Sequence, residues 1–93
     1  MCYTLIIHEV VEYEAWKKIF DKAASIRKEA GEISYQLLKD FSDENRIVHL
    51  SKWSSVEAAK SFFESPKLIA IRMEAGVKNP EFNYLNEIEF NVL

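Results

Sequence analysis

The hydrophobic pattern of the chain changes twice from the alternation of a strand to the period of a helix, and no other feature constrains the fold as much. Tyr3 to Val11 is rich in β-branched and aromatic residues, which is typical of a strand. From Tyr13 to Ala30 apolar residues recur three or four positions apart, which predicts a helix with one apolar face. Gly31 follows where that helix would end. The chain therefore begins with a predicted strand and helix.

A second unit of the same kind begins with a predicted hairpin. Ile33 to Lys39 and Arg46 to Trp53 both read as strands, and the polar stretch "DFSDEN" between them reads as the hairpin loop. Ser54 and Glu57 have the spacing of a capping box, in which each side chain satisfies a free backbone amide at a helix start. A helix is therefore predicted directly after the third strand-like segment.

Proline divides the rest of the chain. Pro66 lacks an amide proton, so the helix is predicted to end there and a second, short helix to begin, with Ser65 as its N-cap and Gly76 at its end. After the "NP" turn, Glu81 to Phe90 alternates enough to predict a last strand.

These elements predict one domain over residues 1–93 with the order β-α-β-β-α-α-β. That order is typical of the α+β ferredoxin-like, or split βαβ, plan, in which helices cover one face of a four-stranded antiparallel sheet. The other face then needs a cover. Because 48% of the residues are apolar, which is rich for a short chain, we expect a second copy to provide it as a homodimer.

Composition argues against several classes of partner and cofactor. The net charge of −3 is spread without a basic block, so nucleic acid is not expected. No apolar run is long enough for a membrane span or a signal peptide, and Cys2 is the only cysteine, so a cytoplasmic protein without disulfides is expected. With only two glycines, the sequence cannot form a glycine-rich phosphate-binding loop. The two histidines have no third ligand residue near them, so no metal site is expected.

Strand alternation indicates where a pocket would lie. Successive side chains of a strand point to opposite faces, and the purely apolar faces, such as the one shared by Leu5 and Ile7, are predicted to meet the helices. The mixed polar residues would then line a pocket on the far face, and they are His8, Gln36, His49, Ser51 and Trp53. His8 and His49 are expected on neighbouring antiparallel strands, within cross-strand reach.

The two histidines are the candidate catalytic residues. An imidazole titrates near neutral pH, so either could take a proton from a phenol or an acidic carbon, and either could instead be a hydrogen-bonded member of a dimer interface. Tyr35 is predicted on the helix side, as a pocket wall or hydrogen-bond donor or as simple packing. Trp53 has the same two interpretations. Arg46 and Arg72 could hold a substrate carboxylate or be solvated surface residues.

Three stretches together resemble the dimeric α/β-barrel superfamily, and specifically the small proteins grouped with antibiotic biosynthesis monooxygenases. "HEVVEYEAWKKIFD" (8–21) is similar to that group's first strand and helix, "LSKWSSVEAAKSFFESPKL" (50–68) to its third strand and broken helix, and "AGVKNPEFNYL" (75–85) to its entry into the last strand. The resemblance spans nearly the whole chain, and it implies the fold more specifically than it implies an activity.

The resemblance implies two alternative functions. Enzymes of the group oxidise electron-rich aromatic polyketides with molecular oxygen and without a cofactor, which would make this protein a monooxygenase-like enzyme for an aromatic or polyketide-like compound. The alternative is a non-catalytic dimeric module that binds a small molecule or serves a pathway partner. Haem-degrading relatives carry an asparagine on the first strand, a tryptophan near the end of the third strand and an iron-ligating histidine on the helical stretch that follows. Of these three, only the tryptophan has a counterpart here, which is Trp53. No cofactor is therefore expected.

Overall fold

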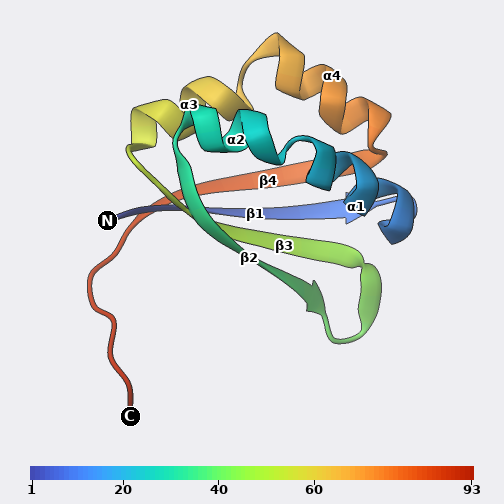
Figure 1. The fold of residues 1–93 in the computed structure, drawn as a ribbon. Coiled ribbons are helices and arrows are strands. Elements are labelled where there is room, and N and C mark those ends of the chain that lie inside the picture. Colours follow the sequence, from blue (N-terminus) through green and yellow to red (C-terminus); the bar gives the residue numbers. More distant parts are fainter.

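The two strand-and-helix units are present in the computed structural model, which describes residues 1–93 (Figure 1). Each unit contains one more helix than a simple βαβ unit needs. The elements are β1 (Cys2–Val10), α1 (Tyr13–Lys22), α2 (Ala24–Ala30), β2 (Glu32–Asp40), β3 (Asp43–Trp53), α3 (Val56–Phe63), α4 (Pro66–Glu74) and β4 (Val77–Asn86).

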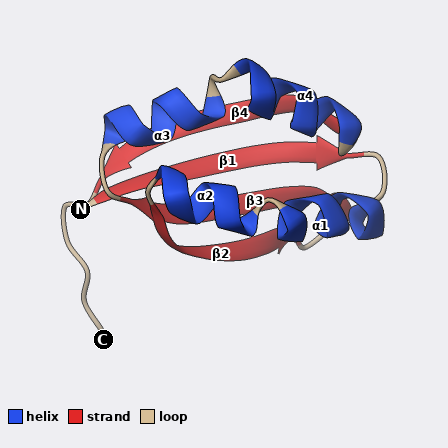
Figure 2. Ribbon diagram, turned by 45° about the horizontal axis from the view of Figure 1, so that its top comes forward, coloured by secondary structure: helices blue, strands red, loops and turns tan.

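The strands form one antiparallel sheet in the order β2-β3-β1-β4. All four helices lie on the same face of this sheet, with α1 and α2 over one part and α3 and α4 over the other (Figure 2). This is the predicted α+β, ferredoxin-like architecture with one open sheet face. No helix is both long and apolar enough to cross a membrane.

The single helix predicted from Tyr13 to Ala30 is in fact two helices that meet at Ala23. The Ala23 amide donates to the carbonyls of both Ile19 and Phe20, and the Arg27 side chain also donates to the Phe20 carbonyl. The Arg27 guanidinium therefore binds a carbonyl that, in a continuous helix, would accept a hydrogen bond from a backbone amide of the next turn. The break directs the Arg27 side chain from α2 toward the sheet, where it contacts Glu32 at the start of β2.

Two predicted boundaries are also wrong by a few residues. The hairpin is tighter than "DFSDEN" suggested, because β2 runs to Asp40 and β3 starts at Asp43, and Asp40 accepts hydrogen bonds from Ser42 in the turn. The N-cap of α3 is Ser55, whose hydroxyl accepts from the Ala58 amide, and not Ser54. The N-cap predicted for α4 is confirmed, since the Ser65 hydroxyl accepts from the Leu68 amide.

The last strand is Val77–Asn86, four residues earlier than the predicted segment Glu81 to Phe90. The "NP" pair lies inside this strand, where Asn79 has a φ of 47° and the register with β1 shifts. Pro80 is tolerated there because β4 is an edge strand, on which one backbone amide is free of the ladder. The chain after Asn86 leaves the body of the domain as an extended tail (Figure 1).

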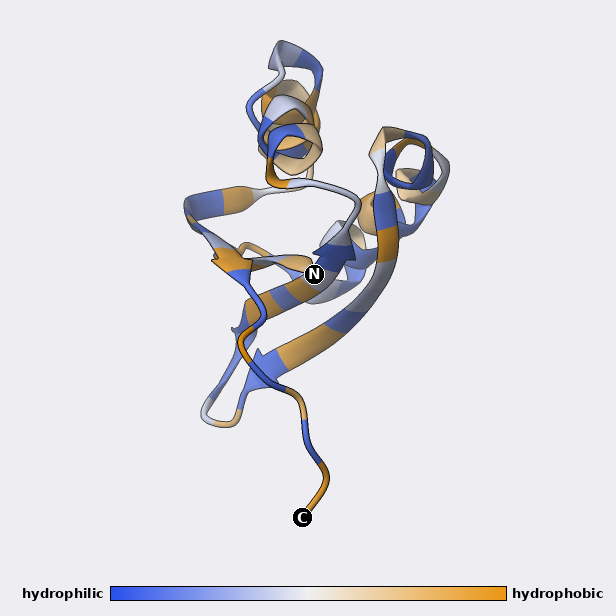
Figure 3. Ribbon diagram, turned by 90° about the vertical axis from the view of Figure 1, so that its left-hand side faces the viewer, coloured by the Kyte–Doolittle hydropathy of each residue, from blue (hydrophilic) through white to orange (hydrophobic).

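The two faces of the sheet are the reverse of the prediction. Bands of hydrophilic and hydrophobic residues alternate along the strands (Figure 3), but the mixed set packs under the helices. Thr4, Ile6 and His8 of β1 are buried there, as are the alternate residues Ile47 to Trp53 of β3. The apolar residues between them, such as Leu5 and Val48, lie on the open face and are half-exposed.

Candidate functional site

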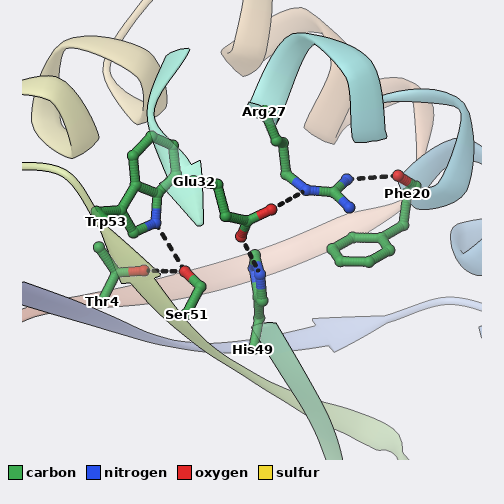
Figure 4. A network of polar contacts seen from close by, with 7 residues as sticks. All are labelled: Thr4, Phe20, Arg27, Glu32, His49, Ser51 and Trp53. Atoms are coloured by element: carbon green, nitrogen blue, oxygen red, sulfur yellow. Dashed lines mark hydrogen bonds and ion pairs between the residues drawn. The ribbon is translucent and has the colours of Figure 1, made fainter. Parts of the chain in front are cut away.

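Three buried side chains, Arg27, Glu32 and His49, form a hydrogen-bonded triad that joins the helices to the sheet (Figure 4). Glu32 opens β2 directly after Gly31, whose φ of 127° turns the chain sharply out of α2. One Glu32 carboxylate oxygen accepts from Arg27 Nε at 2.7 Å, and the other lies 2.8 Å from His49 Nε2. Exposed fractions of 3% for Arg27, 8% for Glu32 and 2% for His49 show that this triad is shielded from solvent.

The charges of the Arg27–Glu32–His49 triad fix the tautomer of His49. Burial alone would raise the pKa of Glu32, but the hydrogen bonds and charges of His49 and Arg27 outweigh burial and hold the pKa below its ordinary value. Glu32 is therefore an ionised acceptor at neutral pH, and His49 Nε2 is the donor. In neutral His49 the basic position is then Nδ1, as in carboxylate–histidine pairs that prepare a general base.

His8 lies on the same sheet face as His49 but in a different environment. The strand register pairs His8 with Ile47 and His49 with Ile6, so the two imidazoles are diagonal neighbours on β1 and β3. The His8 ring packs on Trp16 with a centroid separation of 5.0 Å, and neither of its ring nitrogens has a hydrogen-bond partner in the protein. Burial, followed by the charges of His49 and Arg72, lowers the pKa of His8 from 6.5 to about 4. His8 is therefore neutral at neutral pH.

Both histidines line a cavity between the sheet and the helices. The cavity has a volume of about 60 Å³. Its polar wall is formed by His8, His49, Arg27 and Arg72, and its apolar wall includes the aromatic rings of Trp16, Phe20, Phe62, Phe63 and Phe82. An apolar cavity with a few polar groups is the usual form of a small-molecule site.

A larger groove of about 610 Å³ lies elsewhere, between the start of α1 and the hairpin ends of β2 and β3. It is lined by Glu12, Glu14, Glu44 and Lys39 among others, and it contains no predicted site residue. We place the candidate site in the smaller cavity because the buried titratable groups lie there. No three side chains of the His, Cys, Asp and Glu types come close enough to hold a metal ion.

Of the other predicted site residues, Tyr35 lies beside His49, whereas Ser51 and Trp53 belong to a separate hydrogen-bonded cluster. Tyr35 lies on the helix side, as predicted, and its ring meets His49 edge-on at 5.7 Å. Ser51 and Trp53 are also on the helix side, but they are joined in a closed set of hydrogen bonds with Thr4: Trp53 Nε1 donates to Ser51 Oγ at 2.7 Å, and Ser51 Oγ lies 2.7 Å from Thr4 Oγ1 (Figure 4). This set lies outside the cavity lining and is structural.

Gln36 does not belong to the same face. It pairs with Leu50, whereas Tyr35 pairs with Ser51, so Gln36 points to the open face of the sheet. The prediction of a far-face pocket is therefore wrong for all of the residues that it grouped with Gln36. Polar residues were expected to avoid the helices, but His49, Ser51 and Trp53 are buried there with hydrogen-bond partners, which offset the cost of their burial.

Sequence patterns alone missed Arg27 and Glu32. Arg27 lies four residues after Ala23, on the apolar stripe of the predicted helix, and a charged residue on such a stripe signals a buried partner. Of the two arginines considered for a substrate, Arg46 pairs with Asp40 on the surface and Arg72 lines the cavity.

The family model for antibiotic biosynthesis monooxygenases matches residues 12–73, which is more than half of the chain. The protein belongs to this family. His49, Glu32 and Arg72 fall inside the matched range, whereas His8 precedes it. No curated protein matches the chain at the sequence level.

Several solved structures have the same fold. SnoaB, a cofactor-independent oxygenase from Streptomyces nogalater, is 13% identical with a TM-score of 0.79, and the match covers 96% of this chain and 94% of SnoaB. Rv0793 from Mycobacterium tuberculosis is 17% identical with a TM-score of 0.67, and the match covers 99% of this chain and all 100% of the other. A Caulobacter crescentus protein named provisionally as an antibiotic biosynthesis monooxygenase is 22% identical, with a TM-score of 0.70 and coverage of 95% and 91%. At these identities the similarity establishes a shared fold.

Proposed function

We propose that this antibiotic biosynthesis monooxygenase family member is a cofactor-independent oxygenase for an aromatic or polyketide-like small molecule, with His49 as the general base. The observation that carries the proposal is the hydrogen bond from His49 to the buried, ionised Glu32 at the wall of an aromatic cavity. The cofactor-independent oxygenase SnoaB, which shares the fold, supports the class of reaction.

The proposed reaction needs only the substrate and molecular oxygen. His49 takes a proton from an acidic methylene or phenol, and the substrate anion passes one electron to oxygen. The resulting radical and superoxide combine to a peroxide anion, which takes the proton back from His49 and loses water to leave a carbonyl, so that CH₂ and O₂ become C=O and H₂O. The enzyme's contribution is to hold the base in the correct tautomer and to exclude solvent from the anion.

The size of the cavity limits how the substrate enters. Pockets for drug-sized ligands have volumes of about 300–1,000 Å³, well above the cavity found here. A ring system therefore requires some of the side chains that line the cavity to move, and rotamer changes of this kind commonly accompany binding.

The proposal is tested by oxygen consumption with an anthrone, an aromatic ketone whose ring methylene is acidic. We expect the wild type to consume one oxygen per anthrone, and His49→Gln to lower kcat by about 10²-fold or more, the usual contribution of a general base. Arg46→Gln is the matched control because it removes a surface cation, and it should keep full activity. Equal rates for wild type and His49→Gln would contradict the assigned base.

A ligand that stabilises the protein without consuming oxygen would instead favour the non-catalytic binding module. This outcome is read from a thermal shift with the same anthrone under nitrogen and under air. Stabilisation under both atmospheres with no product would retain the cavity as a binding site and reject the oxygenase.

We also propose that a second copy of the chain covers the open sheet face. Half-exposed or exposed apolar side chains gather there, namely Leu5, Ile7, Leu38, Val48, Leu50 and Leu85. The tail beyond β4 adds Ile88 and Phe90, both largely exposed, in an alternating pattern that suits an added strand. Contiguous apolar patches of this kind mark interfaces. The single buried thiol of Cys2 suits the reducing cytoplasm, where we propose the dimer functions.

Light scattering at micromolar concentration tests the dimer. We expect twice the mass of the chain for the wild type and a monomer for Leu50→Glu, because a carboxylate would be buried without a partner in the interface. Ala70→Glu, on the exposed side of α4, is the matched control and should leave the mass unchanged. A monomeric wild type would reject the proposal.

A further inference from the structure

Arg72 is a half-buried cation that has no anionic partner in the protein. It lies on α4, where its Nη1 donates to the Phe63 carbonyl at 2.9 Å and its guanidinium lies 4.9 Å from the centre of the Phe82 ring. These contacts hold the guanidinium in place but use few of its five N–H donors. Arg27, the other arginine of the cavity, is neutralised by Glu32, whereas Arg72 forms no ion pair.

His8 lines the same cavity, and neither of its ring nitrogens has a hydrogen-bond partner in the protein. Its side chain is buried, and both nitrogens lack a partner, which is rare for buried polar atoms and calls for an explanation at each occurrence. A neutral imidazole offers one N–H donor and one acceptor. A ligand that carries an oxygen would satisfy His8, and no protein group does so.

We propose that Arg72 and His8 together bind the ionised oxygen of an aromatic ligand, a phenolate or enolate whose ring lies among Trp16, Phe63 and Phe82. Both residues line the cavity, and most of its other lining residues are apolar or aromatic. The arginine supplies a charge-assisted hydrogen bond, and its charge acts in surroundings where water is scarce. The aromatic wall selects a ring rather than a small inorganic anion.

This inference rests on the proposed function and adds the class of substrate to it. When His49 removes a proton from a carbon of the ligand, the negative charge is shared with an oxygen conjugated to that carbon. A cation and an N–H donor placed at that oxygen stabilise the anion more than the neutral substrate, which is the condition for an effect on rate. Arg72 and His8 would thus bind the oxygen while His49 takes the proton.

Binding of 4-nitrophenol to the intact protein tests the site without turnover, because its anion has its own visible absorption band. We expect the bound probe to ionise at a lower pH than the free probe. Arg72→Gln should abolish this shift and weaken binding of the anion at least tenfold, while 4-nitroanisole, which has no ionisable oxygen, should bind both proteins alike. Lys67→Gln removes an exposed cation from the same helix and should behave as the wild type.

Two further outcomes keep the inference separate from the oxygenase. Unchanged ionisation of the bound probe, or equal affinity of wild type and Arg72→Gln for the anion, would overturn it, even if anthrone turnover stands. Selective binding of the anion by a protein that consumes no oxygen would support it and reject only the reaction. Arg72→Lys and His8→Leu serve as second variants if Arg72→Gln fails to fold: the lysine should retain part of the shift, and the leucine should weaken binding of the anion.

Discussion

Two histidines on neighbouring strands of one sheet face are buried to a similar degree, yet their surroundings differ completely. His49 is the end of a chain that runs through Glu32 to Arg27, and every charge in that chain has a partner. His8 packs on Trp16 and has no hydrogen bond at all. Burial alone therefore does not indicate a role: hydrogen-bonded polar side chains orient one another, whereas a buried polar group without a partner leaves a place for a ligand.

The largest expected effect on stability follows from a substitution at Glu32, the central residue of the Arg27–Glu32–His49 triad. Glu32→Gln removes the negative charge between Arg27 and His49 and leaves the buried guanidinium without compensation, which typically costs about 3–5 kcal/mol of unfolding free energy. Urea denaturation at neutral pH measures the loss. Asp40→Asn makes the same chemical change in an exposed ion pair with Arg46 and should have little effect. Losses of equal size in the two variants would show that the buried chain has no special contribution.

The next effect is the response of His8 to acid. Because its folded-state pKa of about 4 lies below the unfolded value of 6.5, the unfolded chain binds the proton more readily, and stability falls as the pH is lowered between these two values. The full loss from this group is about 3 kcal/mol, and it is complete below pH 4. The charges of His49 and Arg72 face His8 and add to the effect of burial.

Unfolding free energies of wild type and His8→Leu across this pH range isolate the contribution of His8. The difference between the two proteins should change by about 3 kcal/mol from pH 6.5 to pH 4 and then level off. Glu32 acts in a lower window, because its depressed pKa gives stability above its ordinary value of 4.5 that is lost as the pH falls through the folded value. Parallel curves for the two proteins would contradict the low pKa of His8.

The fold could be predicted from the sequence because its signals are local. A helical stripe, a proline at the start of α4 and a serine cap depend on residues a few positions apart, and they were sufficient for the order of strands and the ferredoxin-like plan. The exceptions are also local. The "NP" pair is turn chemistry in most chains, but here it lies inside an edge strand where Asn79 takes a left-handed conformation.

The candidate site could be predicted only in part because it depends on pairs that are distant in the sequence. Alternation correctly grouped His8, His49, Ser51 and Trp53 on one face, but it could not indicate which face the helices cover. That choice depends on Glu32, seventeen positions from His49, and on Arg27, which together make the polar face suitable for burial. Hydrophobicity alone favoured the opposite face.

The smallest expected effect is the one that separates the two histidines by sign. His8→Leu removes two buried nitrogens that have no partners, and each unsatisfied polar group costs about 1–3 kcal/mol. The substitution also removes the ring contact with Trp16, which offsets part of this gain. We therefore expect the unfolding free energy of the variant to rise by about 1 kcal/mol at neutral pH. His49→Leu makes the same change and should instead lose stability, because it leaves Glu32 buried with one partner fewer. Urea denaturation of both variants at one protein concentration provides the comparison. A loss of stability in His8→Leu equal to that in His49→Leu would mean that His8 is a structural residue, whereas opposite signs are expected if the protein keeps an unsatisfied imidazole for its ligand.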